Sequence, residues 1–101
     1  MLTASFKIDA THPSFAGHFP GNPVTPGVVT LDFIARGLIE QRPEFSLQGF
    51  SQVKFIKPLL PNRKVTVHYK PRSEYVYQFH CEENGDTILS GQIQLGKKAP
   101  V

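Results

Sequence analysis

The sequence predicts an α+β fold in which one long apolar helix is wrapped by a curved antiparallel sheet of about five strands. Residues 28–39 are apolar almost all the way round a helix, which is typical of a buried helix. After residue 64 the apolar residues recur with period two, which is typical of half-buried antiparallel strands. A chain of 101 residues is adequate for one modest core. We therefore expect a single domain over residues 1–96 and a disordered tail over residues 97–101.

The helix has a well-marked beginning. Thr25 is a suitable N-cap residue, and Pro26 suits the first helical position, where its fixed φ and missing N–H cost nothing. The amide of Gly27 then projects from the positive end of the helix without a side chain to shield it. Such an amide suits a carbonyl oxygen on which negative charge develops.

The strands are predicted from alternation and from turn residues. A first strand is expected over Ser5–Asp9, before the helix. Three later strands have these residues on their apolar side: Val65, Val67 and Tyr69; Tyr75, Tyr77, Phe79 and Cys81; Leu89, Gly91, Ile93 and Leu95. Asn84-Gly85 predicts a tight hairpin, while Pro61-Asn62 and Pro71-Arg72-Ser73 indicate the other turns.

The segment 17–32 combines a histidine and a carboxylate with a turn rich in glycine and proline. His18 is the kind of side chain that takes up and returns a proton near neutral pH. Asp32 is able to supply the complementary proton if an apolar setting keeps it protonated, and its neighbours in the chain are apolar. Phe19 and Pro20 belong to a loop that we expect to be rigid and to shape the site. The alternative is a structural histidine and a satisfied buried aspartate.

Two sequence blocks carry a resemblance to a known family. The first is His-Pro-x-Phe-x-Gly-His-Phe-Pro-x-x-Pro-x-x-Pro-Gly-Val over residues 12–28, followed by an acid fourteen residues after the second histidine. The second is Val-Lys-Phe-Ile-Lys-Pro-Leu-Leu-Pro over residues 53–61. In this order they resemble the 3-hydroxyacyl-(acyl carrier protein) dehydratases of bacterial fatty acid synthesis. The resemblance extends from about Phe6 to Leu95.

This resemblance implies a role for each matching residue. His18 corresponds to the catalytic base, Asp32 to the catalytic acid, and Gly27 to the glycine whose amide binds the thioester carbonyl. The carbonyl of Val24 corresponds to the one that orients the imidazole. The family also implies the hotdog fold and a homodimer or higher oligomer, with His18 of one subunit meeting Asp32 of the other.

Arg36 departs from the family pattern, which commonly has glutamine four residues after the acid. Residues at i and i+4 share a helix face, so Arg36 is able to reach Asp32, where its charge would favour the ionised carboxylate. Alternatively Arg36 points across a subunit interface or toward the substrate channel.

The activity that the resemblance implies is elimination of water from a 3-hydroxyacyl thioester to give a trans-2-enoyl thioester, in fatty acid or specialised lipid or polyene biosynthesis. Two alternatives stay open. One is a hotdog thioesterase. The other is a noncatalytic subunit that binds acyl carrier protein or a related dehydratase, and Arg36 is the residue that favours it.

Charge and composition add expectations about partners. The formal net charge is +3, which suits an acidic acyl carrier protein, and candidate docking residues are Lys54, Lys57, Arg63 and Arg72. We expect no nucleic acid or membrane partner and a cytoplasmic location, since one cysteine is typical of a reducing compartment. His68 and His80 lie on the polar side of their strands, and no ligand spacing joins them to an acid. No cofactor and no metal are therefore expected.

Overall fold

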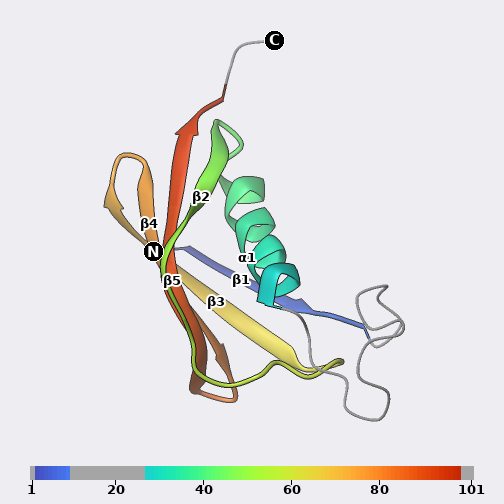
Figure 1. The fold of residues 1–101 in the computed structure, drawn as a ribbon. Coiled ribbons are helices and arrows are strands. Elements are labelled where there is room, and N and C mark those ends of the chain that lie inside the picture. The colour runs from blue at the N-terminus through green and yellow to red at the C-terminus, as the bar shows by residue number, and fades with distance from the viewer. Residues whose placement is uncertain (1, 10–26, 99–101) are drawn as a thin grey trace.

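Five antiparallel strands and one helix make up the protein, as the computed structural model shows for residues 2–9 and 27–98 (Figure 1). The elements are β1 (Leu2–Lys7), α1 (Gly27–Gln41), β2 (Phe45–Phe55), β3 (Lys64–Ser73), β4 (Val76–Glu83) and β5 (Asp86–Lys97). The strands form one sheet in the order β1-β3-β4-β5-β2. The chain from β3 to β5 is a meander, and β2 is the edge strand next to β5.

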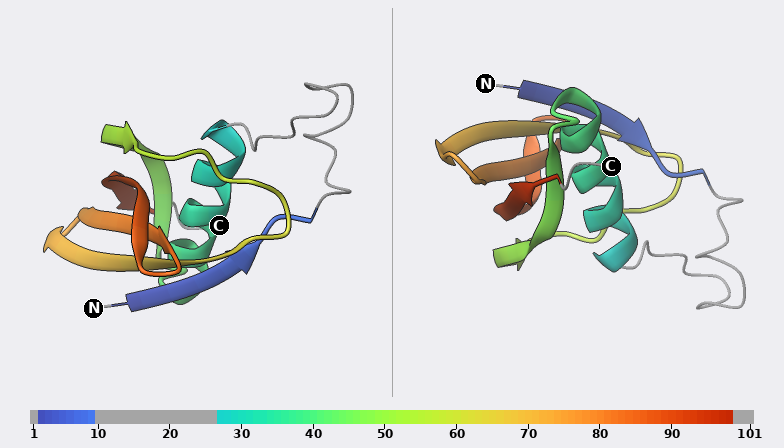
Figure 2. Two further views of the ribbon diagram at one scale, coloured as in Figure 1. Left: turned by 90° about the horizontal axis from the view of Figure 1, so that it is seen from below. Right: turned by 90° about the horizontal axis from the view of Figure 1, so that it is seen from above.

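The helix lies against one face of the sheet, and the sheet curves around it (Figure 2). Thr30, Ile34, Ala35 and Leu38 are the helix residues buried by this contact. The sheet side of the core comes from alternate residues of β3, β4 and β5, which are the expected ones: Val65, Val67, Tyr69, Tyr77, Phe79, Cys81, Leu89, Ile93 and Leu95. The predicted fold, one helix wrapped by an antiparallel sheet, is confirmed.

The predicted hairpin between the last two strands is also confirmed. Asn84 and Gly85 have φ values of 50° and 85°, the left-handed pair that a type I′ turn requires. The flanking residues Glu83 and Asp86 are partners in the ladder. The turn at Pro61-Asn62 is confirmed as well, and there the Asn62 amide donates to the Ile8 carbonyl at 2.8 Å.

Other boundaries differ from the prediction. The first strand covers Leu2–Lys7 instead of Ser5–Asp9, because its ladder partners are residues 64–69 of β3. Residues 71–73, predicted as a turn, belong to β3, and the turn follows at residues 74–75. Pro71 lies at a register shift in the pairing of β3 with β4, between Pro71 and Ser73, and such an irregularity tolerates a residue without an N–H. At the C-terminus, β5 extends to Lys97, one residue into the predicted tail.

The strand β2 has no delimited counterpart in the sequence prediction, and its geometry explains why. Its pairing with β5 shifts register between Leu47 and Gly49 and again between Ser51 and Lys54. Gln52, inside the second irregularity, has a φ of 53°. Each bulge inserts an unpaired residue and exchanges the faces of the residues that follow. The alternation of apolar and polar residues is therefore interrupted twice in one strand.

Within residues 2–9 and 27–98, no helix combines the length and apolarity that a membrane span needs.

Candidate active site

Three of the predicted site residues lie in the described part of the chain. Gly27 is the first residue of α1, and Asp32 and Arg36 follow on the same helix. His18, Phe19, Pro20 and Val24 fall outside the described residues, as do Thr25 and Pro26. The described geometry therefore concerns the helix half of the site and the strand segment that faces it.

Gly27 borders a cavity of about 320 Å³ at the N-terminal end of α1. Its wall on the helix side is completed by Thr30, which is buried. The opposite wall comes from the second sequence block and from β5: Phe55, Ile56, Lys57, Pro58, Leu59, Ile88 and Leu89. The lining is thus mostly apolar, with a helix N-terminus and a lysine at its borders. Such a hollow suits an acyl chain whose polar end lies near the helix.

The aromatic ring of Phe55 explains why a glycine begins the helix. A Cβ atom on Gly27 would lie 2.7 Å from Cζ and 2.8 Å from Cε1 of that ring. Only a residue without a side chain allows the ring to lie this close to the helix N-terminus. The structure therefore brings the two separated sequence blocks into direct contact, through Gly27 from the first and Phe55 from the second.

Asp32 and Arg36 form an ion pair one helical turn apart. Their Oδ2 and Nη2 atoms are 2.8 Å apart, which confirms that Arg36 reaches Asp32. The side chains are 51% and 67% exposed, so the apolar setting expected for Asp32 is absent within a single chain. The arginine also lies over the ring of Phe33, with 5.8 Å between the guanidinium carbon and the ring centroid. The described structure thus holds Asp32 beside a cation at the surface.

The helix is exposed along one ridge, which corrects the expectation that it is buried on every side. Val28, Asp32, Arg36 and Glu40 follow one another at intervals of four and are all exposed. Asp32 borders a hollow of about 330 Å³ that also includes Ala35, Ile39 and Leu47. It does not border the cavity at Gly27, since five residues along a helix amount to a rotation of roughly 140°. Within one chain, Asp32 and Gly27 therefore belong to different hollows.

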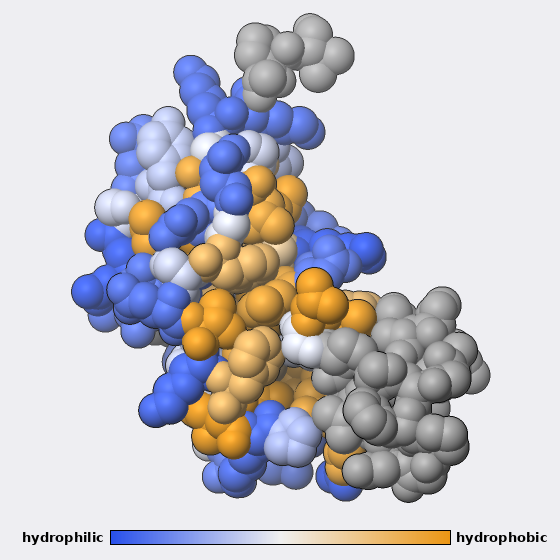
Figure 3. Space-filling view, in the orientation of Figure 1, coloured by the Kyte–Doolittle hydropathy of each residue, from blue (hydrophilic) through white to orange (hydrophobic). Residues whose placement is uncertain are grey.

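Large apolar side chains are exposed beside this ridge and around the cavity. They are Val28, Leu47, Phe55, Ile56 and Leu60, and Val28 is 74% exposed. In the space-filling view, apolar residues gather over the centre of the face that carries α1, with polar residues around them (Figure 3). A contiguous apolar area of this kind is typical of a surface that another chain or a ligand covers.

Sequence reasoning missed several residues of the cavity. Thr30, Ile88 and Leu89 have no motif of their own, and only their apolar or small character and the fold bring them to the end of the helix. Phe55 was part of the second sequence block, but its contact with Gly27 has no signal in the sequence.

Comparison with known proteins places this geometry in a family. The family model ApeI-like, described as ApeI dehydratase, matches residues 1–92. The chain belongs to the ApeI-like dehydratase family. Among solved structures, the chain is similar to one chain of the dehydratase heterocomplex ApeI:P from Xenorhabdus doucetiae, to which it is 26% identical. That match has a TM-score of 0.81 and covers 94% of this chain and 86% of the other.

Curated relatives of this ApeI-like chain include FabZ proteins. The 3-hydroxyacyl-(acyl-carrier-protein) dehydratase FabZ of Rhizobium rhizogenes is 27% identical over 89% of this chain and 64% of its own length. The FabZ of Ehrlichia chaffeensis is 29% identical over 91% of this chain and 71% of its own length. The chain thus spans about two thirds of the length of these relatives. The recognised family and the hotdog fold, with one helix against a five-stranded antiparallel sheet, are both confirmed.

Proposed function

We propose that this chain is a 3-hydroxyacyl thioester dehydratase that releases water and a trans-2-enoyl thioester. The observation that carries the proposal is the cavity at the N-terminus of α1, where Gly27 of the first sequence block meets Phe55 of the second. Its apolar lining suits the acyl chain, and the helix N-terminus suits the thioester oxygen. Membership of a dehydratase family and the names of the FabZ relatives support this reading.

In the proposed reaction three groups act on a substrate held in that cavity. The imidazole of His18 removes the α-proton, and the amide of Gly27 stabilises the charge that develops on the thioester oxygen. The carboxylic acid of Asp32 gives its proton to the departing 3-hydroxyl group, so that water leaves and a C2–C3 double bond forms. Val24, Phe19 and Pro20 position the histidine and shape its loop.

Asp32 serves the site of a second subunit in this proposal. Within one chain it borders a different hollow from Gly27, and the exposed ridge of α1 lies beside the edge strand β2. A second chain that packs against this ridge would cover Val28 and Leu47, which are now exposed. It would also remove water from Asp32, which a general acid requires. A homodimer or a dimer with a related dehydratase subunit would both meet this need.

An acyl carrier protein is the proposed carrier of the substrate. Lys57 borders the cavity, and its side chain is 56% exposed beside Asp86 at 3.5 Å. Lys54 and Arg63 are also exposed. These cations are suited to an acidic partner that delivers an acyl chain to the cavity mouth.

The decisive experiment measures dehydration of a panel of 3-hydroxyacyl thioesters by the full chain, by absorbance of the enoyl product. We expect His18→Ala to lower kcat at least 100-fold, since general base catalysis typically contributes about 10² to 10⁴. Circular dichroism establishes that the variant is folded. Equal rates for the variant and the parent would refute the assignment of His18, and release of free thiol would indicate a thioesterase.

A second candidate is a noncatalytic subunit of a dehydratase heterocomplex. The ion pair between Asp32 and Arg36 favours it, because this contact engages the carboxyl group that the proposed dehydration would use. Mass measurement in solution, alone and with a related dehydratase, separates the two. An active homodimer supports the enzyme, and a chain that is inactive alone but joins the related dehydratase supports the second candidate.

A further inference from the structure

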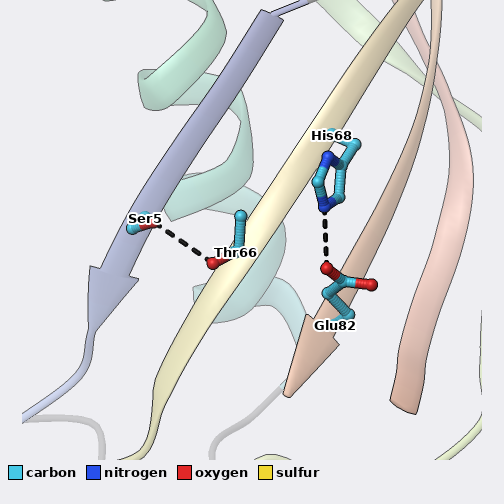
Figure 4. A network of polar contacts seen from close by, with 4 residues as sticks. All are labelled: Ser5, Thr66, His68 and Glu82. Atoms are coloured by element: carbon cyan, nitrogen blue, oxygen red, sulfur yellow. Dashed lines mark hydrogen bonds and ion pairs between the residues drawn. The ribbon is translucent and has the colours of Figure 1, made fainter. Parts of the chain in front are cut away.

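The outer face of the sheet, opposite the helix, carries a compact group of potential metal ligands. His68 on β3 and His80 on β4 are direct partners in the antiparallel ladder, and their rings stack with centroids 4.6 Å apart. Glu82 lies two residues after His80, so it projects from the same face. Its Oε1 atom is 2.8 Å from Nε2 of His68 (Figure 4). The sequence analysis found no ligand spacing that joins these histidines to an acid, but the structure places Glu82 beside both, on the same strand as His80 and diagonal to His68 on the neighbouring strand.

We infer that this cluster binds one divalent transition-metal ion such as Zn²⁺. One ligand atom from each of His68, His80 and Glu82 lies within 4.8 Å of the others. Ligand atoms around a tetrahedral zinc ion are roughly 3.3 Å apart, as bonds of about 2.0–2.1 Å require. Rotation of surface side chains through about 1.5 Å therefore closes the site, with the fourth position open to water. Two imidazoles and one carboxylate form a donor set that Zn²⁺, Co²⁺, Ni²⁺ and Cu²⁺ favour over Mg²⁺ or Ca²⁺.

The surroundings allow an ion to enter and to be held. A hollow of about 210 Å³ is bordered by both histidines together with Lys70 and Gln78. The side chains of His68 and Glu82 are only 25% and 30% exposed, so the strands already restrict their motion. The loss of side-chain conformational entropy on metal binding is therefore smaller than for fully exposed ligands. Among the described residues that border this hollow, Lys70 is the cation, and its charge opposes that of a bound metal ion.

The site is separate from the proposed active site. Residues 67, 69, 79 and 81 project toward the helix and are buried, so residues 68, 80 and 82 project from the opposite face. In Figure 4 the ribbon of α1 lies behind the sheet, while His68 and Glu82 lie in front of it. A negative result for dehydratase activity would therefore not contradict metal binding at this site, and a negative result for metal binding would not contradict dehydratase activity.

The test uses the full chain with His12 and His18 replaced by asparagine, so that His68 and His80 are the remaining histidines. Titration with ZnCl₂ by calorimetry, and with CoCl₂ by visible absorption, should show one equivalent bound. We expect His80→Asn and His68→Asn each to weaken binding at least tenfold, and Glu82→Gln to weaken it by less. Gln78→Ala borders the same hollow and should leave binding within twofold of the parent. Lys70→Gln should tighten it.

Two further readouts keep the inference falsifiable. Metal binds neutral imidazole, so affinity should fall as the solution is acidified. Zn²⁺ should raise the melting temperature of the chain with His12 and His18 replaced, but not that of the same chain carrying His80→Asn. A ligand that binds the folded state and not the unfolded state adds stability. His80 is exposed, so this variant is expected to fold, and circular dichroism verifies it. Absence of binding, or binding that His80→Asn leaves unchanged, would overturn the site.

Discussion

The pair formed by Asp32 and Arg36 determines how the proposed acid behaves. The two side chains are 2.8 Å apart and more than half exposed, an i,i+4 pair of the kind that contributes about 0.3–0.5 kcal/mol. Replacing Arg36 by glutamine removes the cation that lies 2.8 Å from the carboxyl group of Asp32 and leaves that group free to hydrogen-bond to a substrate. We therefore expect Arg36→Gln to raise kcat for dehydration by roughly twofold or more, as about 0.5 kcal/mol in the barrier implies. Steady-state rates on one 3-hydroxyacyl thioester provide the measurement.

Two control variants accompany this prediction at the same helix surface. Arg36→Lys keeps the positive charge and should retain the parent rate. Glu40→Gln changes the next exposed residue of the ridge without touching the pair, and should have little effect. A lower kcat in Arg36→Gln would show that the guanidinium itself helps the reaction, for example by contacting substrate across an interface.

Residue-level reasoning from the sequence succeeded where a local pattern carries the information. The left-handed turn at Asn84-Gly85 and the reach of Arg36 to Asp32 both follow from spacing alone, and both are confirmed. The exposure of Asp32 does not follow from its neighbours in the chain, because apolar neighbours on a helix point in other directions. The contact between His68 and Glu82 depends on cross-strand register, which a single strand does not specify.

At the scale of elements, one glycine sets how closely the helix approaches the sheet. The buried hydroxyl of Tyr69 donates a 2.6 Å hydrogen bond to the Ile34 carbonyl of α1. A Cβ atom on Gly37 would lie 2.7 Å from that hydroxyl oxygen and 2.9 Å from Cβ of Ala4 on β1. The helix therefore rests on β1 and β3 at this glycine, which cannot accept a methyl group without moving one of them.

Gly37→Ala should consequently destabilise the fold, although alanine is the better helix former by about 1 kcal/mol. We expect a net loss of roughly 1–3 kcal/mol in the free energy of unfolding, as overpacking in a close-packed interface typically costs. Urea unfolding followed by circular dichroism measures it. Gly49→Ala is the matched control, because nothing lies within 4 Å of its added Cβ atom.

The double variant with Tyr69→Phe tests the cause of this loss. Phenylalanine lacks the hydroxyl that the new methyl group would meet, so Gly37→Ala should cost less in that background. An unchanged cost would locate the obstruction at Ala4 instead.

Among the elements themselves, the sequence predicted the helix and the strands β3 to β5 well. It did not delimit β2, since two bulges interrupt the alternation that identifies a strand.

At the scale of the whole molecule, two buried acidic groups connect stability to alkaline pH. The thiol of Cys81 and the hydroxyl of Tyr69 are fully buried, and Tyr69 contacts the helix. Burial raises the pKa of the Cys81 thiol from 9.0 to about 12, and the acidic residues Glu82 and Glu83 add to the shift. Burial likewise raises the pKa of Tyr69 above its ordinary 10.0. The folded chain therefore retains protons that the unfolded chain has already released.

The free energy of unfolding should fall as the pH rises above 9, because there the folded state binds more protons than the unfolded state. The slope from Cys81 grows from about −0.7 kcal/mol per pH unit at pH 9.0, where half of the unfolded thiol is ionised, toward about −1.4, and Tyr69 adds a similar slope as the pH passes through 10.0. Urea unfolding at pH 8, 9.5 and 10.5 under reducing conditions measures this. Cys81→Ala should lower stability at pH 8 but flatten the slope between pH 9 and 10, because the thiol no longer titrates. An equally steep decline in Cys81→Ala would assign the alkaline transition to other groups.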